Sequence, residues 1–281
     1  MTQVLHNAAE PSHEEPTPLS GQAPLTFAGS ATSAAPSAAS IATLSSVSAL
    51  MLLIDGRFPA GGHAHSGGFE VAASREDVTD IATMKQFLLG RLHTTGLVAA
   101  AFAAASCLSF ERMTKTSDNI GIAMFSDHLA VLDAEFDART PSPALRVVSR
   151  RLGRQLVRAG RRIWPHPLIE EMARVPGQGV HQPVAFGVVA GAAGQHPVLA
   201  ATAAAQESIT GPATASVRLL GLDPFDVNAL LASLAEDVAA VAAEAFDAAL
   251  LPPADLPARA GYLIDISAEV HATWEVRLFA S

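Results

Sequence analysis

The residues best suited to chemistry in this sequence are gathered in one glycine-rich stretch, residues 55–70 (DGRFPAGGHAHSGGFE). It holds five glycines, two histidines, a serine, a proline and three charged residues, between segments rich in Ala and Leu. Pro59 restricts its own backbone, and the paired glycines allow bends that side chains forbid. We therefore expect a rigid bend that presents polar side chains for recognition: His63, His65, Ser66 and Glu70.

One chemistry suggested by this stretch is nucleophilic catalysis. Residues 64–68 (AHSGG) approximate the G-x-S-x-G elbow of serine hydrolases, with Ser66 as the nucleophile and His65 or another histidine as the base. That elbow requires a β-strand before the serine. The residues before Ser66 are predicted to form a helix and then a loop, so the context disfavours a hydrolase but leaves it as an alternative.

A second chemistry is metal binding by His63 and His65. Two histidines at i and i+2 do not share one helical face, and no carboxylate or third histidine follows at a familiar ligand spacing. The sequence therefore predicts no stable metal site within one chain, and hydrogen bonding within the bend is the favoured role of both histidines. A transient site, or one shared between subunits, stays open.

Missing motifs and composition exclude several other functions. The chain has no G-x-x-x-x-G-K-[ST] phosphate loop, no H-E-x-x-H helix and no C-x-x-C pair. Its net charge of −9 opposes binding to nucleic acid, which requires a cationic surface. The single cysteine, Cys107, allows no internal disulfide and fits a reducing cytoplasm.

No segment predicts secretion or a membrane span. Residues 1–54 contain no Lys or Arg, so the basic start of a secretory signal is missing. The most apolar later segment, residues 183–205, is interrupted at His196-Pro197 after about a dozen residues, which is too short to cross a bilayer. We expect a cytoplasmic protein without a membrane partner.

The elements around the glycine-rich stretch are predicted to be helices. Hydrophobic residues make up 49% of the chain and aromatic residues only 5%, so the core must be built from Ala, Leu and Val, which suits closely packed helices. We predict an all-α fold, a single helical-bundle domain of about eight to ten helices over residues 42–281. Residues 1–41 are rich in Ala, Ser and Pro and are predicted to be a disordered extension.

Glycine and proline predict where these helices end. We expect Gly96 to separate two helices, and Gly211-Pro212 to separate a helix over 197–209 from one over 213–220. Asp223-Pro224 is a strong start signal, and the pattern after it predicts one long helix.

The helix predicted over residues 144–163 carries an isolated cationic surface. Seven arginines lie in it, and five of them form an i, i+4 ladder that includes Arg150 and Arg154. Like charges at this spacing repel, so an anion is expected nearby. The counterpart is either a neighbouring helix, for which residues 223–247 with six acids and no bases are the candidate, or a docked partner.

Taken together, these motifs resemble those of the urease accessory protein F family, in the form of its actinobacterial members. Residues 52–55 (LLID) and 58–70 (FPAGGHAHSGGFE) are similar to its signature, approximately L-x-P-x-G-G-x-x-x-S-x-G-L-E. Three later segments support the resemblance: 149–156 (SRRLGRQL), 181–189 (HQPVAFGVV) and 216–222 (SVRLLGL). The sequence departs from the usual pattern at three positions, Phe69, Gly221 and His63, where members often have Leu, Pro and Phe.

The resemblance implies an all-α, dimeric protein that is not an enzyme and binds no cofactor stably. Such a protein is a scaffold that works with a D/H-type accessory protein and with the G-type GTPase on apo-urease. Within this complex nickel is delivered and the active-site lysine is carbamylated. The alternatives are the serine hydrolase and a stand-alone nickel carrier.

The resemblance also indicates which residues contact partners. The family docks its C-terminal tail and last helices on the D/H-type protein, which here means residues 274–279 and the neighbouring helices. The glycine-rich stretch and Arg218 are motif positions. Helix capping can instead account for Ser66 and Glu70. The predicted partner-binding residues are Pro59, Gly61, Gly62, His63, His65, Ser66, Glu70, Arg150, Arg154, Arg218, Trp274, Arg277, Leu278 and Phe279.

Overall fold

The computed structural model describes residues 38–114, 119–175 and 177–279. Within these residues every regular element is helical and no strand occurs, which confirms the predicted all-α fold. Ala38–Ser281 forms one compact unit. The disordered extension predicted for residues 1–41 lies outside the described residues, except that the first helix already begins at Ala38.

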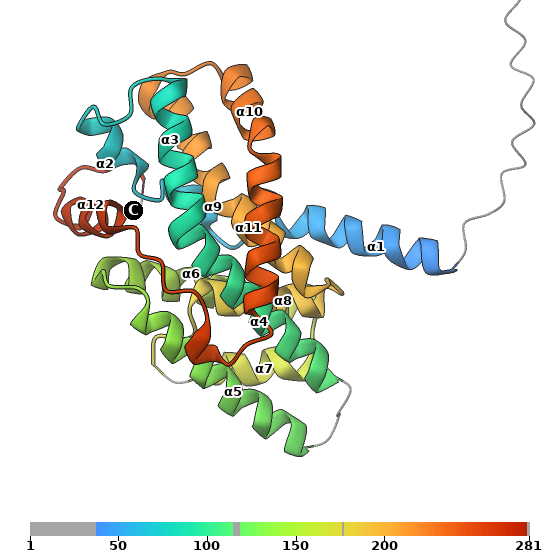
Figure 1. The fold of residues 1–281 in the computed structure, drawn as a ribbon. Coiled ribbons are helices and arrows are strands. Elements are labelled where there is room, and N and C mark those ends of the chain that lie inside the picture. Colours follow the sequence, from blue (N-terminus) through green and yellow to red (C-terminus); the bar gives the residue numbers. More distant parts are fainter. Residues whose placement is uncertain (1–37, 115–118, 176, 280–281) are drawn as a thin grey trace, which may run out of the picture. The chain divides into compact units, whose positions relative to one another are not determined.

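The described elements are α-helices, two short 3-10 helices and one π-helical turn (Figure 1). In chain order they are α1 (Ala38–Leu53), η1 (Gly62–Ala64), α2 (Phe69–Ser74), α3 (Ile81–Arg91), η2 (Leu92–Gly96), α4 (Leu97–Thr114), α5 (Asn119–Ala138), α6 (Pro143–Ile163), α7 (Pro167–Ala173), α8 (Gln182–Ala192), α9 (Pro197–Leu220), α10 (Pro224–Ser233), α11 (Ala235–Ala248), η3 (Pro253–Asp255) and α12 (Tyr262–Ala272). The short helix α7 has no counterpart among the predicted helices.

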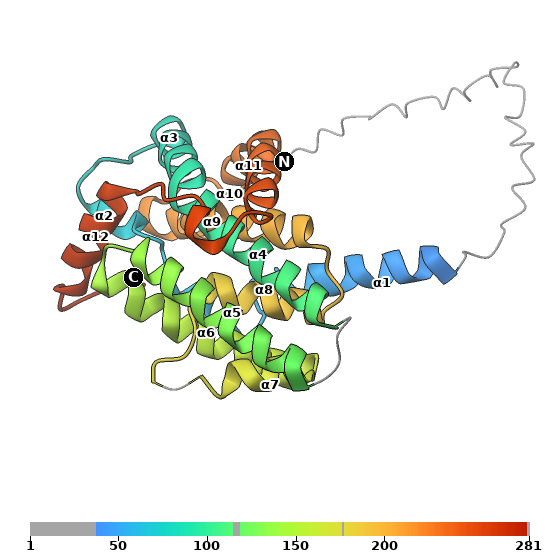
Figure 2. The same cartoon turned by 60° about the horizontal axis from the view of Figure 1, so that its bottom comes forward.

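Helix α4 lies at the centre of the core. It packs against α5, α8, α9 and α11 (Figure 2), and most of its side chains from Leu97 to Phe110 are buried. Small residues bring neighbouring backbones close: a Cβ at Gly187 in α8 would lie 2.1 Å from the carbonyl oxygen of Ala103. The alanine-rich composition therefore serves the helix crossings, where larger side chains would keep the helices apart.

Helices α3 and α4 are joined without a break, so the predicted separation at Gly96 is wrong. Leu92–Gly96 forms a π-helical turn, which accommodates an extra residue without ending the helix. Gly96 serves packing instead, because a Cβ there would lie 2.7 Å from the Ser208 hydroxyl of α9. In the described part of the chain, Ile81–Thr114 is the one helix long and apolar enough to span a membrane, and 72% of its apolar window is buried in the protein.

Helix α9 also continues through the predicted break at Gly211-Pro212. A proline inside a helix removes the amide that would bond the carbonyl four residues earlier, here that of Ser208. The side chain of Arg91 in α3 supplies a donor, with its Nε 2.7 Å from the Ser208 carbonyl oxygen. A long-range contact thus maintains a helix that the local signals predict to end.

The segment predicted as one long helix from Asp223-Pro224 is instead two helices. The start signal is confirmed, since Asp223 Oδ1 accepts a hydrogen bond from the amide of Phe225 at 2.7 Å. Helix α10 ends and α11 begins at Leu234, which is buried. After this bend α11 contacts α4 and α9, whereas α10 contacts α3 and α9.

Candidate functional site

The glycine loop, residues 55–68, leads from α1 to α2 and is anchored on α6. The carboxylate of Asp55 accepts hydrogen bonds from the Arg57 amide at 2.8 Å and from its Nε at 3.0 Å, which closes a tight turn. Phe58 is buried and stacks on Trp164 at the end of α6, with ring centroids 6.0 Å apart. These contacts fix the first half of the loop.

The first glycine pair lets the loop lie directly on α6 and α9. Gly61 has a φ of +79°, which favours glycine, and a Cβ there would lie 2.0 Å from the side-chain oxygen of Gln155 in α6. A Cβ at Gly62 would lie 3.2 Å from a carboxylate oxygen of Glu207 in α9. The start of η1 is therefore held between these two helices.

In the second glycine pair, Gly67 lies against α3 and α9. Gly67 has a φ of +61°, and its carbonyl accepts a hydrogen bond from Nη1 of Arg91 at 2.8 Å. A Cβ at Gly67 would also lie 3.3 Å from Cγ of Pro212. Burial lowers the pKa of Arg91 to about 10, so the guanidinium stays protonated at neutral pH and binds both the loop and α9.

Ser66 is a structural residue in this arrangement. Its side chain is fully buried, at 0% exposure, and its Oγ accepts a hydrogen bond from the amide of Glu70 at 3.3 Å in the first turn of α2. This agrees with the predicted capping role, although Gly68 is the residue that directly precedes the helix. A hydrolase elbow would expose its serine after a strand, so the geometry does not fit the hydrolase alternative.

Glu70 joins the glycine loop to the C-terminal tail, residues 274–279. Glu70 is only 6% exposed, and its carboxylate accepts three hydrogen bonds that all come from the C-terminal region. The donors are His271 Nε2 at 2.8 Å, the Leu278 amide at 2.8 Å and the Phe279 amide at 3.1 Å. A buried carboxylate with this many donors holds the tail against α2.

Arg218, at the end of α9, contacts the same tail. Its guanidinium carbon lies 5.6 Å from the centroid of the Phe279 ring, a cation–π geometry. The ring of Trp274 lies 5.2 Å from that of His271, next to the Glu70 contact. Glu70, Arg218 and Phe279, which are far apart in the sequence, therefore meet at one place.

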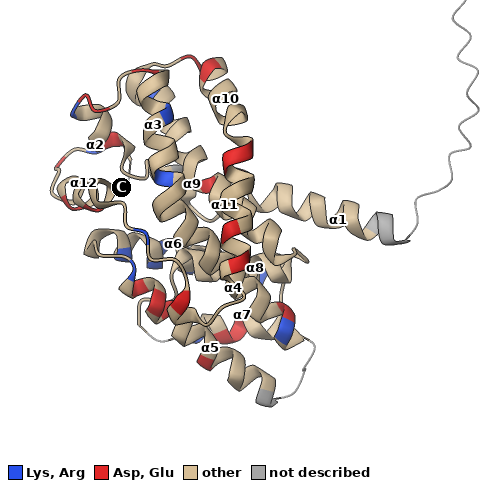
Figure 3. Cartoon of the chain, in the orientation of Figure 1, with Lys and Arg blue, Asp and Glu red and all other residues tan. Residues whose placement is uncertain are grey.

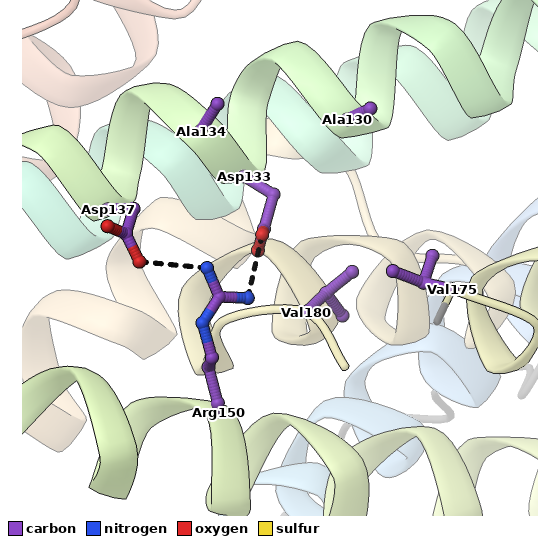
Figure 4. A pocket seen from close by; sticks show the side chains of 7 residues that line it. All are labelled: Ala130, Asp133, Ala134, Asp137, Arg150, Val175 and Val180. Carbon is purple, nitrogen blue, oxygen red and sulfur yellow. Dashed lines mark hydrogen bonds and ion pairs between the residues drawn. The ribbon is translucent and has the colours of Figure 1, made fainter. Parts of the chain in front are cut away.

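Two of the predicted residues lie elsewhere. Arg150 in α6 forms ion pairs with Asp133 at 2.9 Å and Asp137 at 2.8 Å, and Figure 4 shows its guanidinium between these two carboxylates of α5. Arg154 donates to the backbone carbonyl of Gln178. Residues 223–247 were the candidate acidic partners of the α6 arginines. For Arg150 this prediction is wrong, because its acidic partners belong to α5.

The Arg150 cluster borders a cavity of about 390 Å³ and includes a buried histidine. The His181 amide donates to Asp133 at 2.7 Å, and its Nε2 lies 2.9 Å from Asp137. Burial lowers the pKa of His181, although the hydrogen bond to Asp137 opposes this. Burial also raises the pKa of Asp137, but the hydrogen bonds from Arg150 and His181 outweigh it and hold this pKa below its usual value. The remaining lining residues are Ala130, Ala134, Val175 and Val180.

Glu207 is the one charged side chain between residues 175 and 217, and it lies beside the glycine loop. It reaches solvent, but the surrounding protein partly desolvates it and raises its pKa. A hydrogen bond from Gln182 Nε2 at 3.2 Å opposes that shift. Glu207 and Gln182 therefore add polar groups to the surface of the loop that the sequence motifs did not mark.

Among the described residues there is no group of three or more His, Cys, Asp or Glu side chains placed to hold a metal ion. The side chain of His63 is outside the described residues. The absence of a stable metal site in one chain thus stays a prediction.

Comparisons with known proteins agree with the motif resemblance. The family model UreF matches residues 78–235, a region that begins after the glycine loop. The urease accessory protein UreF of Mycobacterium sp. (strain JLS) is 42% identical over 241 residues, which are 85% of this chain and 100% of that protein. UreF of Mycolicibacterium vanbaalenii is 41% identical with the same coverage, and UreF of Mycobacterium tuberculosis is 38% identical over 204 residues, 72% of this chain and 86% of that protein.

Proposed function

This chain belongs to the UreF family of urease accessory proteins, and on that premise we propose that it is a non-enzymatic scaffold for urease maturation. It acts in the cytoplasm as a homodimer, together with a D/H-type accessory protein, and recruits the G-type GTPase to apo-urease. Nickel is inserted and the active-site lysine carbamylated within that complex, while this chain binds no cofactor stably.

The attachment of the tail to Glu70 is the observation that carries the scaffold proposal. It fixes the last described residues of the chain while large apolar side chains on α12 and the tail remain exposed. Tyr262 is 74% exposed, Leu263 78% and Val276 84%. Several exposed apolar side chains within one short segment are typical of a protein-binding surface, and we assign α12 and the tail to the D/H-type protein.

Polar residues in and beside the glycine loop support the same proposal. Ser66 and Glu70 are buried and make hydrogen bonds within the chain, and Arg91 is bound to two backbone carbonyls. Groups engaged in this way stabilise a surface and are not available to a substrate. A fold-stabilising loop beside exposed apolar side chains is what a scaffold requires.

Co-purification tests the proposal. The tagged chain is expressed with the D/H-type protein and the GTPase, and size exclusion with light scattering is run with and without a GTP analogue. We expect a defined complex that contains two copies of this chain. If both partners elute separately in every nucleotide state, the proposal is wrong.

Two exposed leucines provide a matched pair of variants for that experiment. Leu263→Asp on α12 should prevent binding of the D/H-type protein. Leu250→Asp, at a leucine that is also exposed but follows α11, should leave binding intact. Equilibrium dialysis of the isolated wild-type chain against nickel distinguishes the remaining alternative, since a stand-alone carrier binds stoichiometric metal without partners.

A further inference from the structure

One face of α6 carries arginines that nothing in the described part of the chain neutralises. This arginine face consists of Arg151, Arg158 and Arg162, which are exposed and make no ion pair or side-chain hydrogen bond with any described residue. Their spacing of seven and four residues places them on one side of a helix. They form a single cationic stripe along α6.

The other arginines of α6 all have acceptors. Arg146 and Arg150 pair with Asp137, and Arg161 pairs with Glu170 of α7 at 2.8 Å. Arg154 binds a backbone carbonyl. Acids of α5 and α7 and the Gln178 carbonyl therefore bind the other arginines of α6, but not those of the arginine face.

An uncompensated cationic face is unexpected in this protein. The chain has 27 acidic and 18 basic residues, so acids were available to pair with it. Arg158 and Arg162 are one turn apart, where like charges repel. Figure 3 shows acidic residues on α10 and α11, which are separate helices from α6. Two of these acids have basic partners of their own: Asp237 pairs with His93 and Glu244 pairs with Arg259.

The arginine face borders the glycine loop. Gln155 lies one turn after Arg151 on α6, and Gly61 of the loop covers it so closely that a Cβ there would lie 2.0 Å from its side-chain oxygen. Beyond Arg162, Trp164 stacks on Phe58 of the loop. The loop therefore lies next to the arginine face at Gln155, one turn from Arg151.

We propose that the arginine face of α6 docks an acidic surface of a partner protein, with the edge of the glycine loop at its border. This inference rests on the proposed scaffold function and gives that function a second contact surface besides α12 and the tail. Complementary charges at an interface raise the association rate and select the partner, which suits a complex that must assemble in a defined order.

A second copy of this chain does not fit as the occupant. Two-fold pairing through this face would place arginines against arginines, since the same patch is used on both subunits. Docking onto the acidic α10 and α11 of another copy in a head-to-tail arrangement would build a ring or an open filament, and not the proposed homodimer. A nucleic acid or an anionic membrane is disfavoured because the net charge of the chain is −9.

Charge reversal tests the proposal. Arg151→Glu/Arg158→Glu is compared with Lys85→Glu/Arg112→Glu, two exposed positions on α3 and α4 that change the net charge by the same amount. Circular dichroism and thermal unfolding establish that both double variants fold. Binding of the D/H-type protein, the GTPase and apo-urease is then measured separately for each variant and for the wild type.

We expect the α6 variant to bind one of the three partners about tenfold or more weakly than the control variant at low salt. The difference should shrink at 1 M salt, where the Debye length falls to about 3 Å. If the wild type binds none of the partners, the scaffold function itself fails. If it binds them and the α6 variant binds all three equally well, only the arginine-face proposal fails.

Two further probes address the other anionic ligands. A DNA duplex and phosphatidylserine vesicles are tested with the wild type and both double variants. Binding of either probe by the wild type that only the α6 variant loses, with all protein partners still bound, would overturn the proposal. No binding of either probe, together with loss of one protein partner, supports it.

Discussion

Arg91 and Ser208 form the contact that keeps α9 continuous: the Arg91 Nε donates at 2.7 Å to the carbonyl that Pro212 leaves without a helical donor. The same guanidinium donates to the Gly67 carbonyl at 2.8 Å through Nη1. One planar side chain thus compensates for a proline within a helix and holds the glycine loop. The integrity of α9 and the position of the loop are therefore physically linked.

Replacing Arg91 by Met should destabilise the protein, because two backbone carbonyls lose their donor. We expect the free energy of unfolding to fall by about 2–4 kcal/mol, since a buried acceptor left unpaired costs about 1–3 kcal/mol. Urea denaturation measures the change. Pro212→Ala restores an amide for Ser208, so the loss caused by Arg91→Met should be about 1 kcal/mol smaller in that background. Strictly additive effects would show that Arg91 does not compensate for the proline.

The same contact shows which parts of the fold could be predicted from sequence. Helix starts such as Asp223-Pro224 depend on a side chain that bonds a neighbouring amide, so the signal is local and the prediction was correct. The continuation of α9 past Pro212 depends on a side chain 117 positions away from Ser208. No local pattern contains that information, so the local signals at Gly96 and Pro212 wrongly predict breaks.

The substitution Glu70→Gln should release the C-terminal tail from α2. The amide keeps an acceptor but loses the charge that strengthens its bonds to the Leu278 and Phe279 amides. Hydrogen exchange at these two amides should accelerate by at least about tenfold, which corresponds to about 1.4 kcal/mol. Glu275→Gln, at an exposed carboxylate of the same tail, is the control and should leave exchange unchanged. Equal protection in both variants would rule out the anchoring role of Glu70.

The site could be predicted only in part for a related reason. Glu70, Arg218 and Phe279 belong to segments whose motifs are informative, and the structure brings them together. His271 carries no such signal, although it donates to the same carboxylate at 2.8 Å. Capping and the helix dipole already account for a glutamate in the first turn of a helix. The sequence therefore gives no reason to expect that Glu70 also binds residues far along the chain.

Gly61→Ala should displace the first half of the glycine loop. A Cβ would be placed 2.0 Å from the Gln155 side-chain oxygen, on a backbone with a φ of +79°. We expect a loss of about 1–3 kcal/mol in the free energy of unfolding, from strain in the left-handed region. Gly56→Ala in the same loop is the control, since a Cβ there has no atom within 4 Å. Gly61→Ala/Gln155→Ala should recover the part of the loss that is due to the clash, and no recovery would contradict the close contact.

Lowering the pH should destabilise the protein through His181. Burial lowers the pKa of this histidine in the folded state, because its charged form loses water there, so the unfolded chain binds a proton that the folded chain does not. The free energy of unfolding should therefore fall as the pH decreases below about 6.5, the ordinary pKa of histidine. Urea denaturation between pH 8 and 5 measures the slope, and His181→Gln should reduce it. Burial also lowers the pKa values of His128 and His166, so the His181→Gln variant should keep a smaller dependence of stability on pH with the same sign. An unchanged slope in His181→Gln would show that another group controls the acid sensitivity.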